Sequence, residues 1–463
     1  MEFIDRESEL QRLNRGLAQV GSFCVIWGRR RVGKSRLLIE WCRRCNGLYT
    51  VAEHSAPEVQ RRYLASAVAE RFPGFADVEY PSWRALFERV SAEADQIGWP
   101  GPFVVDELPY IIAADRGFPS EFQNWLDQPG RKLRVVVSGS SQSMMHRAVL
   151  DASAPLFGRA VESFALRPLT AGFLSRSFKF GQPSDLVEIY ALWGGMPRYW
   201  ELAVPFGHDL DAAVDSLVLD PSGPLHHEPE RLLREEIPPA TSLRPLLDVI
   251  GSGAHRLSEI AGRLGRSATS LARPIAALVE MGLVRREVPF GSNPRSGKRS
   301  LYRIDDPFLR LWFRVVAPHR AALAASPPDV RLQYWHRHKR QLEASAWEEL
   351  CSAAVPRLHK CDHPLARLGP FEPAQRYWHG NIPERDLVAR SVDESRVLVG
   401  EAKRSLDRNR TARSLAGLAN ADLPGVSERD IVPVLFVQRA NELPRQTELG
   451  FVVDAESVLS ALR

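Results

Sequence analysis

Apolar and polar positions along the first part of the chain follow the pattern of a parallel sheet covered by helices. Three apolar runs predict buried strands and two amphipathic stretches predict helices: residues 23–27, 103–105 and 133–137 for the strands, and residues 58–72 and 82–97 for the helices. A leading amphipathic helix is expected after Asp5, which can cap it. We therefore expect an α/β domain over residues 1–165 and a helical lid with a linker over residues 166–240.

The second half of the chain begins with a different pattern. Three helices followed by two strands are expected over residues 241–305, in the order of a winged helix-turn-helix. An aromatic helix and a polar stretch predict a helical connector over residues 306–341. A final α/β unit is expected over residues 342–463, with a helix around Trp347 and a strand at residues 397–403.

Composition and charge narrow the classes of protein without naming one. Hydrophobic residues make up 44% and charged residues 25% of the 463, which is ordinary for a globular protein and excludes a disordered or fibrous one. The net charge of +5 permits a polyanionic partner but does not require one. No signal segment and no apolar run of about 18 residues is present, so we expect a cytoplasmic protein that does not enter a membrane. The five cysteines are interpreted as reduced structural thiols.

The strand at residues 23–27 runs into Gly28-Arg-Arg-Arg-Val-Gly-Lys-Ser35, which fits the pattern G-x-x-x-x-G-K-[ST] between a strand and a helix. Glycines let the backbone curl so that its N–H groups point at phosphate oxygens, and the helix that follows adds its positive dipole end. Lys34 is expected at the β- and γ-phosphates and the Ser35 hydroxyl at Mg²⁺. The alternative is an arginine-rich surface turn. The predicted phosphate-binding residues are Gly28, Arg29, Arg30, Arg31, Val32, Gly33, Lys34, Ser35 and Arg36.

Two acidic residues end the apolar run at residues 103–105. A parallel strand delivers such residues to the carboxyl edge of its sheet, where α/β proteins bind ligands. Asp106 is expected to hold Mg²⁺ through water, and Glu107 is expected to polarise the water that attacks the γ-phosphate. Strands often end in acids, so this pair gains its meaning from the phosphate loop before it.

Further candidates for the same site follow the next strand. Ser138 or Ser140 is a candidate for sensing the γ-phosphate, and a Ser/Gly turn is the alternative. Arg159 lies beyond a turn, where it could stabilise the transferring phosphoryl group in cis or from a neighbouring subunit; a surface arginine is the alternative. An arginine supplied by a neighbouring subunit requires a second copy of the chain, so a homo-oligomer formed through the ATPase domain is one expected state. The pair His226 and His227 lies in a stretch interpreted as a linker and lacks further metal ligands.

The winged-helix pattern carries candidate DNA-binding residues. Polar residues at the start of its third helix suit approach to a major groove, and basic residues in the loop between the strands suit phosphate contacts. These are Arg266, Ser267, Thr269 and Ser270, and Arg295, Lys298 and Arg299. Double-stranded DNA is the expected partner, and a winged helix that contacts only proteins is the alternative.

The last unit contains Glu401-Ala402-Lys403 at the end of an apolar strand, preceded by Asp386 on a possible hairpin partner. Side chains two apart on a strand share a face, so the three could converge. Two carboxylates and a lysine can hold a divalent metal and assist an attacking water, and Glu348 or Glu349 could complete the metal shell. A solvated strand edge with mixed charges is the alternative.

Taken together, these residues resemble a known family: archaeal-type ATPases, also widespread in bacteria, that join an AAA+ related STAND ATPase to a winged helix and a C-terminal PD-(D/E)XK nuclease-like domain. The marks of the resemblance are GRRRVGKS from Gly28, FVVDE ending at Glu107, SGSS from Ser138, PLFGR ending at Arg159, GGMPRY from Gly194 and YRIDDPFLRLWFRVV from Tyr302. The chain departs from the pattern at Arg385, where an apolar residue would suit the strand better.

The resemblance implies a multidomain α/β protein with an AAA+ type P-loop sheet, a helical lid, a winged helix and a restriction-endonuclease-like final domain. It implies ATP and Mg²⁺ as cofactors, with Lys34, Ser35, Asp106 and Glu107 in binding and hydrolysis. The leading hypothesis is an ATP-driven or ATP-switched protein that acts on DNA. A nucleotide-dependent signalling switch that contacts only proteins is the alternative, and an active metal-dependent nuclease is a third.

Overall fold

The structure is a computed structural model of the chain and describes residues 3–140, 142–236, 243–293, 299–379, 382–423, 426, 430–440 and 443–463. The chain forms two compact units. The first unit contains Asp5–Pro168 and Met196–Arg198, and the second contains Met1–Ile4, Leu169–Gly195 and Tyr199–Arg463. Most of residues 166–240, expected to form a lid and linker, therefore belong to the second unit, and only residues 166–168 and 196–198 belong to the first.

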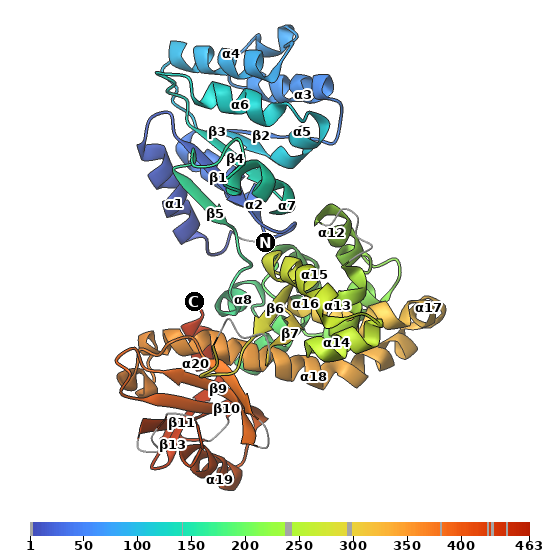
Figure 1. Cartoon of the computed structure of the whole chain (residues 1–463), viewed down its shortest axis with the longest axis vertical. Coiled ribbons are helices and arrows are strands. Elements are labelled where there is room, and N and C mark those ends of the chain that lie inside the picture. The colour runs from blue at the N-terminus through green and yellow to red at the C-terminus, as the bar shows by residue number, and fades with distance from the viewer. Residues whose placement is uncertain are drawn as a thin grey trace. The chain divides into compact units, whose positions relative to one another are not determined.

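A five-stranded parallel sheet forms the centre of the first unit (Figure 1). The spatial order is β2-β3-β4-β1-β5, so β4 lies between β1, which precedes the phosphate loop, and β3, which ends in the two acids. Its strands are β1 (Phe23–Trp27), β2 (Leu48–Val51), β3 (Phe103–Asp106), β4 (Val135–Gly139) and β5 (Glu162–Ala165). The strands β1, β3 and β4 are buried along nearly their whole length, as expected for strands covered on both faces.

Helices cover both faces of this sheet. One face packs against α3, α4 and α6 through a large aromatic core in which Phe87, Phe118 and Phe122 make ring contacts. On the other side α1 and α2 are joined by a hydrogen bond from the Trp41 indole to Asn14 (2.9 Å). The helices are α1 (Glu7–Ala18), α2 (Lys34–Cys45), α3 (Pro57–Ala69), α4 (Trp83–Gln96), α5 (Leu108–Ala114), α6 (Phe118–Leu126) and α7 (Gln142–Met145).

The second unit begins with a group of short helices. They are α8 (Leu174–Ser177), α9 (Pro183–Trp193), α10 (Pro197–Ala203), α11 (Leu210–Val214) and α12 (Glu228–Glu236). The helix α12 corrects the interpretation of the stretch around His226 and His227 as a linker, because Leu232 and Leu233 are buried and hold α12 in the core. His226 is buried as well, and its ring Nδ1 contacts the Val218 carbonyl at 2.8 Å, so this histidine has a structural role.

Three helices and a hairpin follow in the predicted order. They are α13 (Arg244–Gly251), α14 (Leu257–Leu264), α15 (Ala268–Glu280), β6 (Val284–Glu287) and β7 (Leu301–Ile304). The two strands pair antiparallel, with Val284 opposite Ile304, and Arg256 forms an additional bridge to Leu301. Buried apolar residues of the three helices, including Leu246, Ile260 and Leu271, face the interior of this small group.

A long helix then runs directly into the final part of the chain. The helices are α16 (Pro307–Leu311), α17 (Ala317–Ala325) and α18 (Pro328–Ala354). The boundary predicted between residues 341 and 342 falls inside α18, which is continuous over 27 residues. The cause is burial on both sides of that point, since Trp335 and Trp347 are both buried along the same helix.

The C-terminal part is a mixed six-stranded sheet in the order β12-β13-β11-β10-β9-β8. Its core packs α19 against one face, while α18 contributes Trp347, whose indole donates to the Phe436 carbonyl (3.2 Å). The elements are β8 (Gln375–His379), β9 (Ile382–Arg390), β10 (Val397–Ser405), α19 (Arg408–Ala419), β11 (Ile431–Arg439), β12 (Gln446–Thr447), β13 (Gly450–Asp454) and α20 (Ala455–Ala461).

Candidate nucleotide-binding site

The loop between β1 and α2 has the backbone that its glycines predict. Gly28 has φ 153° and Gly33 has φ 99°, both in the region that favours glycine. A Cβ on Gly28 would lie 2.6 Å from the Leu166 carbonyl oxygen, so no larger residue fits there without moving the backbone. Arg31, between the glycines, also has a positive φ of 68°. The loop therefore curls before α2 begins at Lys34.

Lys34 lies almost completely buried inside this curl. Its ammonium donates to the Gly28 carbonyl at 2.9 Å and to the Arg29 carbonyl at 3.4 Å. Its side chain thus already spans the loop in which phosphates would lie. Ser35 is exposed at the first turn of α2, where a hydroxyl can reach a metal ion bound to the phosphates.

Arg6 supports the loop from outside, and the sequence did not indicate it. Its guanidinium donates to the Val32 carbonyl at 3.0 Å and pairs with Glu9 at 3.1 Å. Asp5 and Arg6 both have positive φ, and α1 begins at Glu7 with Arg6 at its N-cap. The prediction that Asp5 caps this helix was wrong, because the chain turns at Asp5 to bring Arg6 onto the loop.

The carboxylate of Asp106 is fully buried at the end of β3 and carries hydrogen bonds on both oxygens. The Ser138 hydroxyl and the Glu107 backbone N–H (2.9 Å) donate to Oδ1, and the Tyr49 hydroxyl (2.7 Å) donates to Oδ2. A buried carboxylate without such donors would cost several kcal/mol. These donors fix the direction of the group that is expected to face Mg²⁺.

Glu107 has φ 55°, a left-handed conformation that is rare for a residue with a side chain. The backbone N–H (3.1 Å) and the hydroxyl (2.7 Å) of Ser140 both donate to its Oε2. Ser138 and Ser140 therefore hold Asp106 and Glu107 in this structure. The strand order explains this role, because β4 lies between β1 and β3 and its tip reaches the acids.

Tyr49 is a site residue that sequence reasoning missed. It comes from β2, whose pairing with β3 places Val51 opposite Asp106. Burial and then the neighbouring Asp106 charge raise the pKa of Tyr49. It therefore remains a neutral donor to the Asp106 carboxylate. The only sequence signal was a tyrosine in the strand after α2.

A second missed residue is Arg198. Met196–Arg198 groups with the first unit although the chain on both sides belongs to the second. The Pro197 ring lies beside the phosphate loop, 3.7 Å from the position of a Cβ on Gly33. Arg198 is exposed one residue further on, in the first turn of α10. A cation at this position is suited to contact a phosphate in the loop.

Arg159, in contrast, is engaged elsewhere. Its guanidinium makes two hydrogen bonds to the Asp127 carboxylate, at 2.8 and 2.7 Å, and a third to the Pro155 carbonyl. This pairing lowers the pKa of Asp127. The prediction that Arg159 serves the phosphoryl group in cis is not supported, because its donors are used at the end of α6.

The thiols of the first unit behave as structural groups. Burial raises the pKa of Cys24 and of Cys42 to about 12, and it raises the pKa of Cys45 as well. These thiols stay protonated at neutral pH and are poor nucleophiles and metal ligands.

The predicted DNA-binding residues are only partly described. Arg266, Ser267, Thr269 and Ser270 are all exposed at the start of α15, where the Ser267 hydroxyl caps the helix by accepting from the Ser270 N–H (3.3 Å). Arg299 is exposed, while Arg295 and Lys298 lie outside the described residues. The start of α15 is therefore an accessible helix end.

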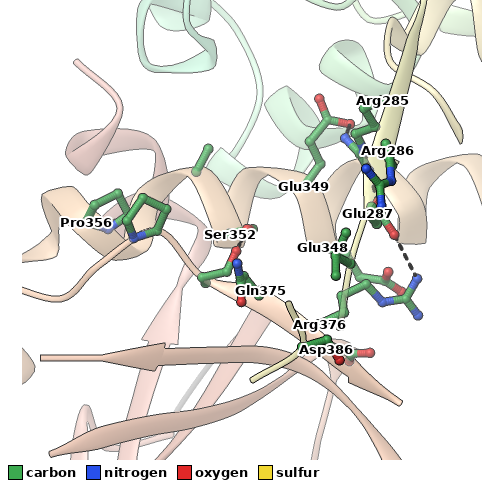
Figure 2. Close-up of a pocket in the computed structure, with 15 residues that line it drawn as sticks. Arg285, Arg286, Glu287, Glu348, Glu349, Ser352, Pro356, Gln375, Arg376 and Asp386 are labelled. Carbon is green, nitrogen blue, oxygen red and sulfur yellow. Dashed lines mark hydrogen bonds and ion pairs between the residues drawn. The ribbon is translucent and has the colours of Figure 1, made fainter. Parts of the chain in front are cut away.

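Glu401 and Lys403 meet as predicted, at 3.0 Å, but within the described residues neither forms a hydrogen bond or ion pair with Asp386. Asp386 lines a cavity together with Glu348 (Figure 2), and its Oδ2 accepts from the Ala402 N–H at 3.0 Å. Glu401 instead pairs with Arg385 (2.9 Å) and Lys403 (3.0 Å). The guanidinium of Arg385 also reaches the Gly417 carbonyl of α19 at 3.3 Å.

A bulge in β9 is the physical reason for this separation. Gln375 and Tyr377 are two residues apart on β8, but their partners Val388 and Arg385 are three apart on β9. An extra residue breaks the alternation of side chains between the two faces of a sheet. Within the described residues, no group of three His, Cys, Asp or Glu side chains could hold a metal ion, so the predicted metal set of Asp386, Glu401 and Glu348 is not assembled. Glu349 is bound by Arg285 and Arg310 instead.

The geometry of the first unit, with a curled glycine loop, a buried lysine and an oriented acid pair at one sheet edge, defines the class of P-loop ATPases. Residues 3–202 match the family described as an ATPase domain predominantly from Archaea, and residues 312–415 match a family described as Archaea bacterial proteins of unknown function. Residues 3–202 thus carry an archaeal-type ATPase domain, as the resemblance implied, and residues 312–415 carry a domain of the second family.

Two further proteins are similar to most of the chain. An uncharacterized protein of Methanocaldococcus jannaschii is 29% identical over 413 residues, which cover 87% of each chain. The Walker-type ATPase PABY2304 of Pyrococcus abyssi is similar in structure, with a TM-score of 0.54 and 21% identity, over 68% of this chain and 96% of that one. At this identity the likeness shows the fold alone. The ORC2 protein of Aeropyrum pernix has a TM-score of 0.38 at 15% identity, over 74% of this chain and 95% of that one, and is too different to support an inference.

One finding bears on membranes. In the described part of the chain, no helix is both long enough and apolar enough to cross a bilayer.

We predict that Tyr49→Phe lowers Mg²⁺-dependent ATP turnover by about tenfold, because one donor to the Asp106 carboxylate is lost and a hydrogen bond to a charged group contributes about 1.5–3 kcal/mol. Steady-state phosphate release measures the effect. Tyr63→Phe is the matched control, since Tyr63 is exposed on α3. Turnover of Tyr49→Phe at the wild-type rate would show that Tyr49 does not position Asp106.

Proposed function

We propose that the first unit binds ATP with Mg²⁺ and hydrolyses it. The observation that carries this proposal is the Asp106 carboxylate, fully buried yet oriented by Tyr49, Ser138 and the Glu107 backbone beside the phosphate loop. An anion is kept in such a place only where its charge is used or fully compensated. Mg²⁺ supplies the charge that neutralises the phosphates when bound; Ser35 would hold it directly and Asp106 through water.

The other residues of the site take complementary roles. The loop amides from Gly28 to Lys34 and the α2 N-terminus would bind the phosphates, and the Lys34 ammonium would exchange its carbonyl partners for β- and γ-phosphate oxygens. Glu107 would orient the attacking water, with Ser140 holding one of its oxygens. Arg198 is a further candidate for contacting the γ-phosphate.

The position of Met196–Arg198 supports a nucleotide switch. This segment groups with the first unit, and the chain continues from both of its ends into α9 and α10 of the second. A change in the phosphates that moves Pro197 or Arg198 would therefore pull directly on those helices. We interpret this as an AAA+/STAND type arrangement, in which bound nucleotide selects between conformations.

We further propose that α13, α14, α15 and the β6–β7 hairpin act as a winged helix that contacts double-stranded DNA. The order of elements, the bridge from Arg256 to Leu301 and the exposed polar start of α15 support this role. Protein contact through the same surface is the competing function. DNA cleavage is not part of the proposal, because Asp386 and Glu401 contact different neighbours.

Glu107→Gln is expected to keep ATP affinity and to lower turnover by at least about a hundredfold, because the amide cannot accept a proton from the attacking water. Lys34→Ala is expected to abolish nucleotide binding, since the cation at the phosphates is lost. Equilibrium binding of a fluorescent ATP analogue and phosphate release separate the two effects. Hydrolysis at the wild-type rate by Glu107→Gln would remove Glu107 from the mechanism.

Binding to duplex DNA is expected to weaken with salt, with a slope of a few units in a log–log plot, because each phosphate contact releases about 0.9 counterion. Arg266→Ala should reduce the slope by about 1, whereas Arg62→Ala, which removes an exposed arginine of α3, should leave it unchanged. Fluorescence anisotropy with a labelled duplex gives both values. Absence of affinity even at low salt would favour a protein partner.

A further inference from the structure

A cavity of about 490 Å³ opens between the β6 strand, α18 and the strands β8 and β9 of the second unit. Figure 2 shows Pro356 at one end, Ser352 and Gln375 in the middle, and a group of charged side chains at the other end. Its volume is that of sites that take a small organic ligand. One end of the cavity is apolar and the other is polar, which suits a ligand with a polar head and an apolar body.

The arginines at the polar end already have partners. Arg285 pairs with Glu287 at 2.9 Å and with Glu349 at 3.3 Å. Arg376 pairs with Glu384 at 3.4 Å and lies 3.7 Å from Glu287. Arg286 donates to the Ser300 hydroxyl at 2.7 Å. Each of these three arginines thus has a partner in the protein, although the Arg376 Nη1 forms no hydrogen bond within the part of the chain that the structure describes.

The carboxylates of Glu348 and Asp386 are the groups that remain. Among the described residues, no side chain or backbone group forms a hydrogen bond or ion pair with Glu348, although it is half-buried in the wall. Asp386 accepts the Ala402 N–H with Oδ2, which orients the carboxylate and leaves Oδ1 for another donor. The chemistry that this cavity offers is therefore that of hydrogen-bond acceptors with negative charge.

We propose that this cavity binds a small ligand whose head presents a pair of N–H donors on one carbon, as a guanidinium group or a guanine base does, to the carboxylates of Glu348 and Asp386. Two parallel N–H···O bonds between a forked donor and a carboxylate give both strength and geometric selection. The apolar body of the ligand would lie along Ala353 and Pro356 toward the other end.

A metal ion held by protein side chains alone fits less well. Within the part of the chain that the structure describes, Glu348 and Asp386 have no third His, Cys, Asp or Glu beside them that completes a metal site. A flat organic head can instead use the carboxylates and also contact the Gln375 amide and the Ser352 hydroxyl, which donates to the Ala374 carbonyl at 3.1 Å.

The charge around Glu348 makes the site sensitive to pH. Burial and then the Asp386 charge raise the pKa of Glu348; Glu287 acts in the same direction, whereas Arg376 and Arg303 oppose it. Cys351 of the same helix is buried and stays neutral, since burial raises its pKa as well. A donor head binds the ionised carboxylate, so ligand affinity is full above the raised pKa and falls as the pH decreases through it.

Isothermal titration calorimetry on the full-length chain tests the proposal with two pairs of matched probes. Agmatine carries a guanidinium group, and putrescine lacks this group while it keeps the same four-carbon chain, an amine and the total charge. Guanosine carries the N–H pair of guanine, and inosine lacks its 2-amino group. We expect agmatine or guanosine to bind about tenfold or more tightly than its analogue, with an affinity that falls as the pH is lowered.

Variants assign the binding to the cavity. Glu348→Gln and Asp386→Asn should each weaken the preferred probe by about tenfold, whereas Glu372→Gln, which removes an exposed carboxylate of the same domain, should have no effect. Unchanged ATP-analogue binding by the first unit and an unchanged melting temperature show that each variant is folded.

Each outcome decides the question. Binding of agmatine alone assigns the site to guanidinium ligands, and binding of guanosine alone assigns it to a nucleobase. Equal binding of the matched analogues, no binding of any probe, or binding that Glu348→Gln leaves intact would overturn the proposal.

Discussion

The buried carboxylate of Asp106 is the interaction on which the nucleotide site depends. A charge fully removed from water must be compensated, and here three donors from three places in the chain provide the compensation: Tyr49 on β2, Ser138 on β4 and the Glu107 backbone N–H. The Tyr49 and Ser138 hydroxyls are in reach because β3 lies between β2 and β4 in the order β2-β3-β4-β1-β5, whereas the Glu107 N–H follows Asp106 directly in the chain. The same order places the tip of β4 between the acids and the phosphate loop. The strand order therefore determines both the sheet and the arrangement of the site.

The loop itself is held by contacts of a similar kind. Lys34 spans the loop by donating to the Gly28 and Arg29 carbonyls, and Arg6 fixes the Val32 carbonyl from the other side. These are hydrogen bonds to charged donors, which are stronger than those between neutral groups. The loop therefore has a defined shape before any ligand binds, which lowers the entropic cost of ordering it around phosphates.

In the second unit, ion pairs between charged side chains connect the β6–β7 hairpin to the long helix α18. Glu349 of α18 forms ion pairs with Arg310 of α16 and Arg285 of β6, and Glu287 of β6 forms one with Arg303 of β7. These partly buried pairs join the hairpin to the long helix, and breaking one would leave an uncompensated charge. Because these charged groups are paired with each other, Glu348 and Asp386 remain as the acceptors of the cavity. The same wall therefore contains structural ion pairs and, apart from them, the candidate binding groups.

The sequence by itself determined the elements and the local chemistry. The glycines of the phosphate loop require φ values that only glycine tolerates well, the apolar runs predicted β1, β3 and β4, and three helices with a hairpin appeared in the predicted order. Such features depend on neighbours in the chain, and so a pattern of residues can indicate them. The resemblance to archaeal-type ATPases rested on the same local marks.

Only the tertiary structure decided which side chains meet. Tyr49 reaches Asp106 across 57 positions, and Arg159 is taken by Asp127 rather than by a phosphate. A single extra residue in β9 separates Asp386 from Glu401, although simple alternation would have put them together. The helix α18 continues across the boundary predicted at residue 342, because Trp335 and Trp347 are both buried along it. Strand register, bulges and long-range burial depend on the packing of the whole chain, and no local pattern of residues predicts them.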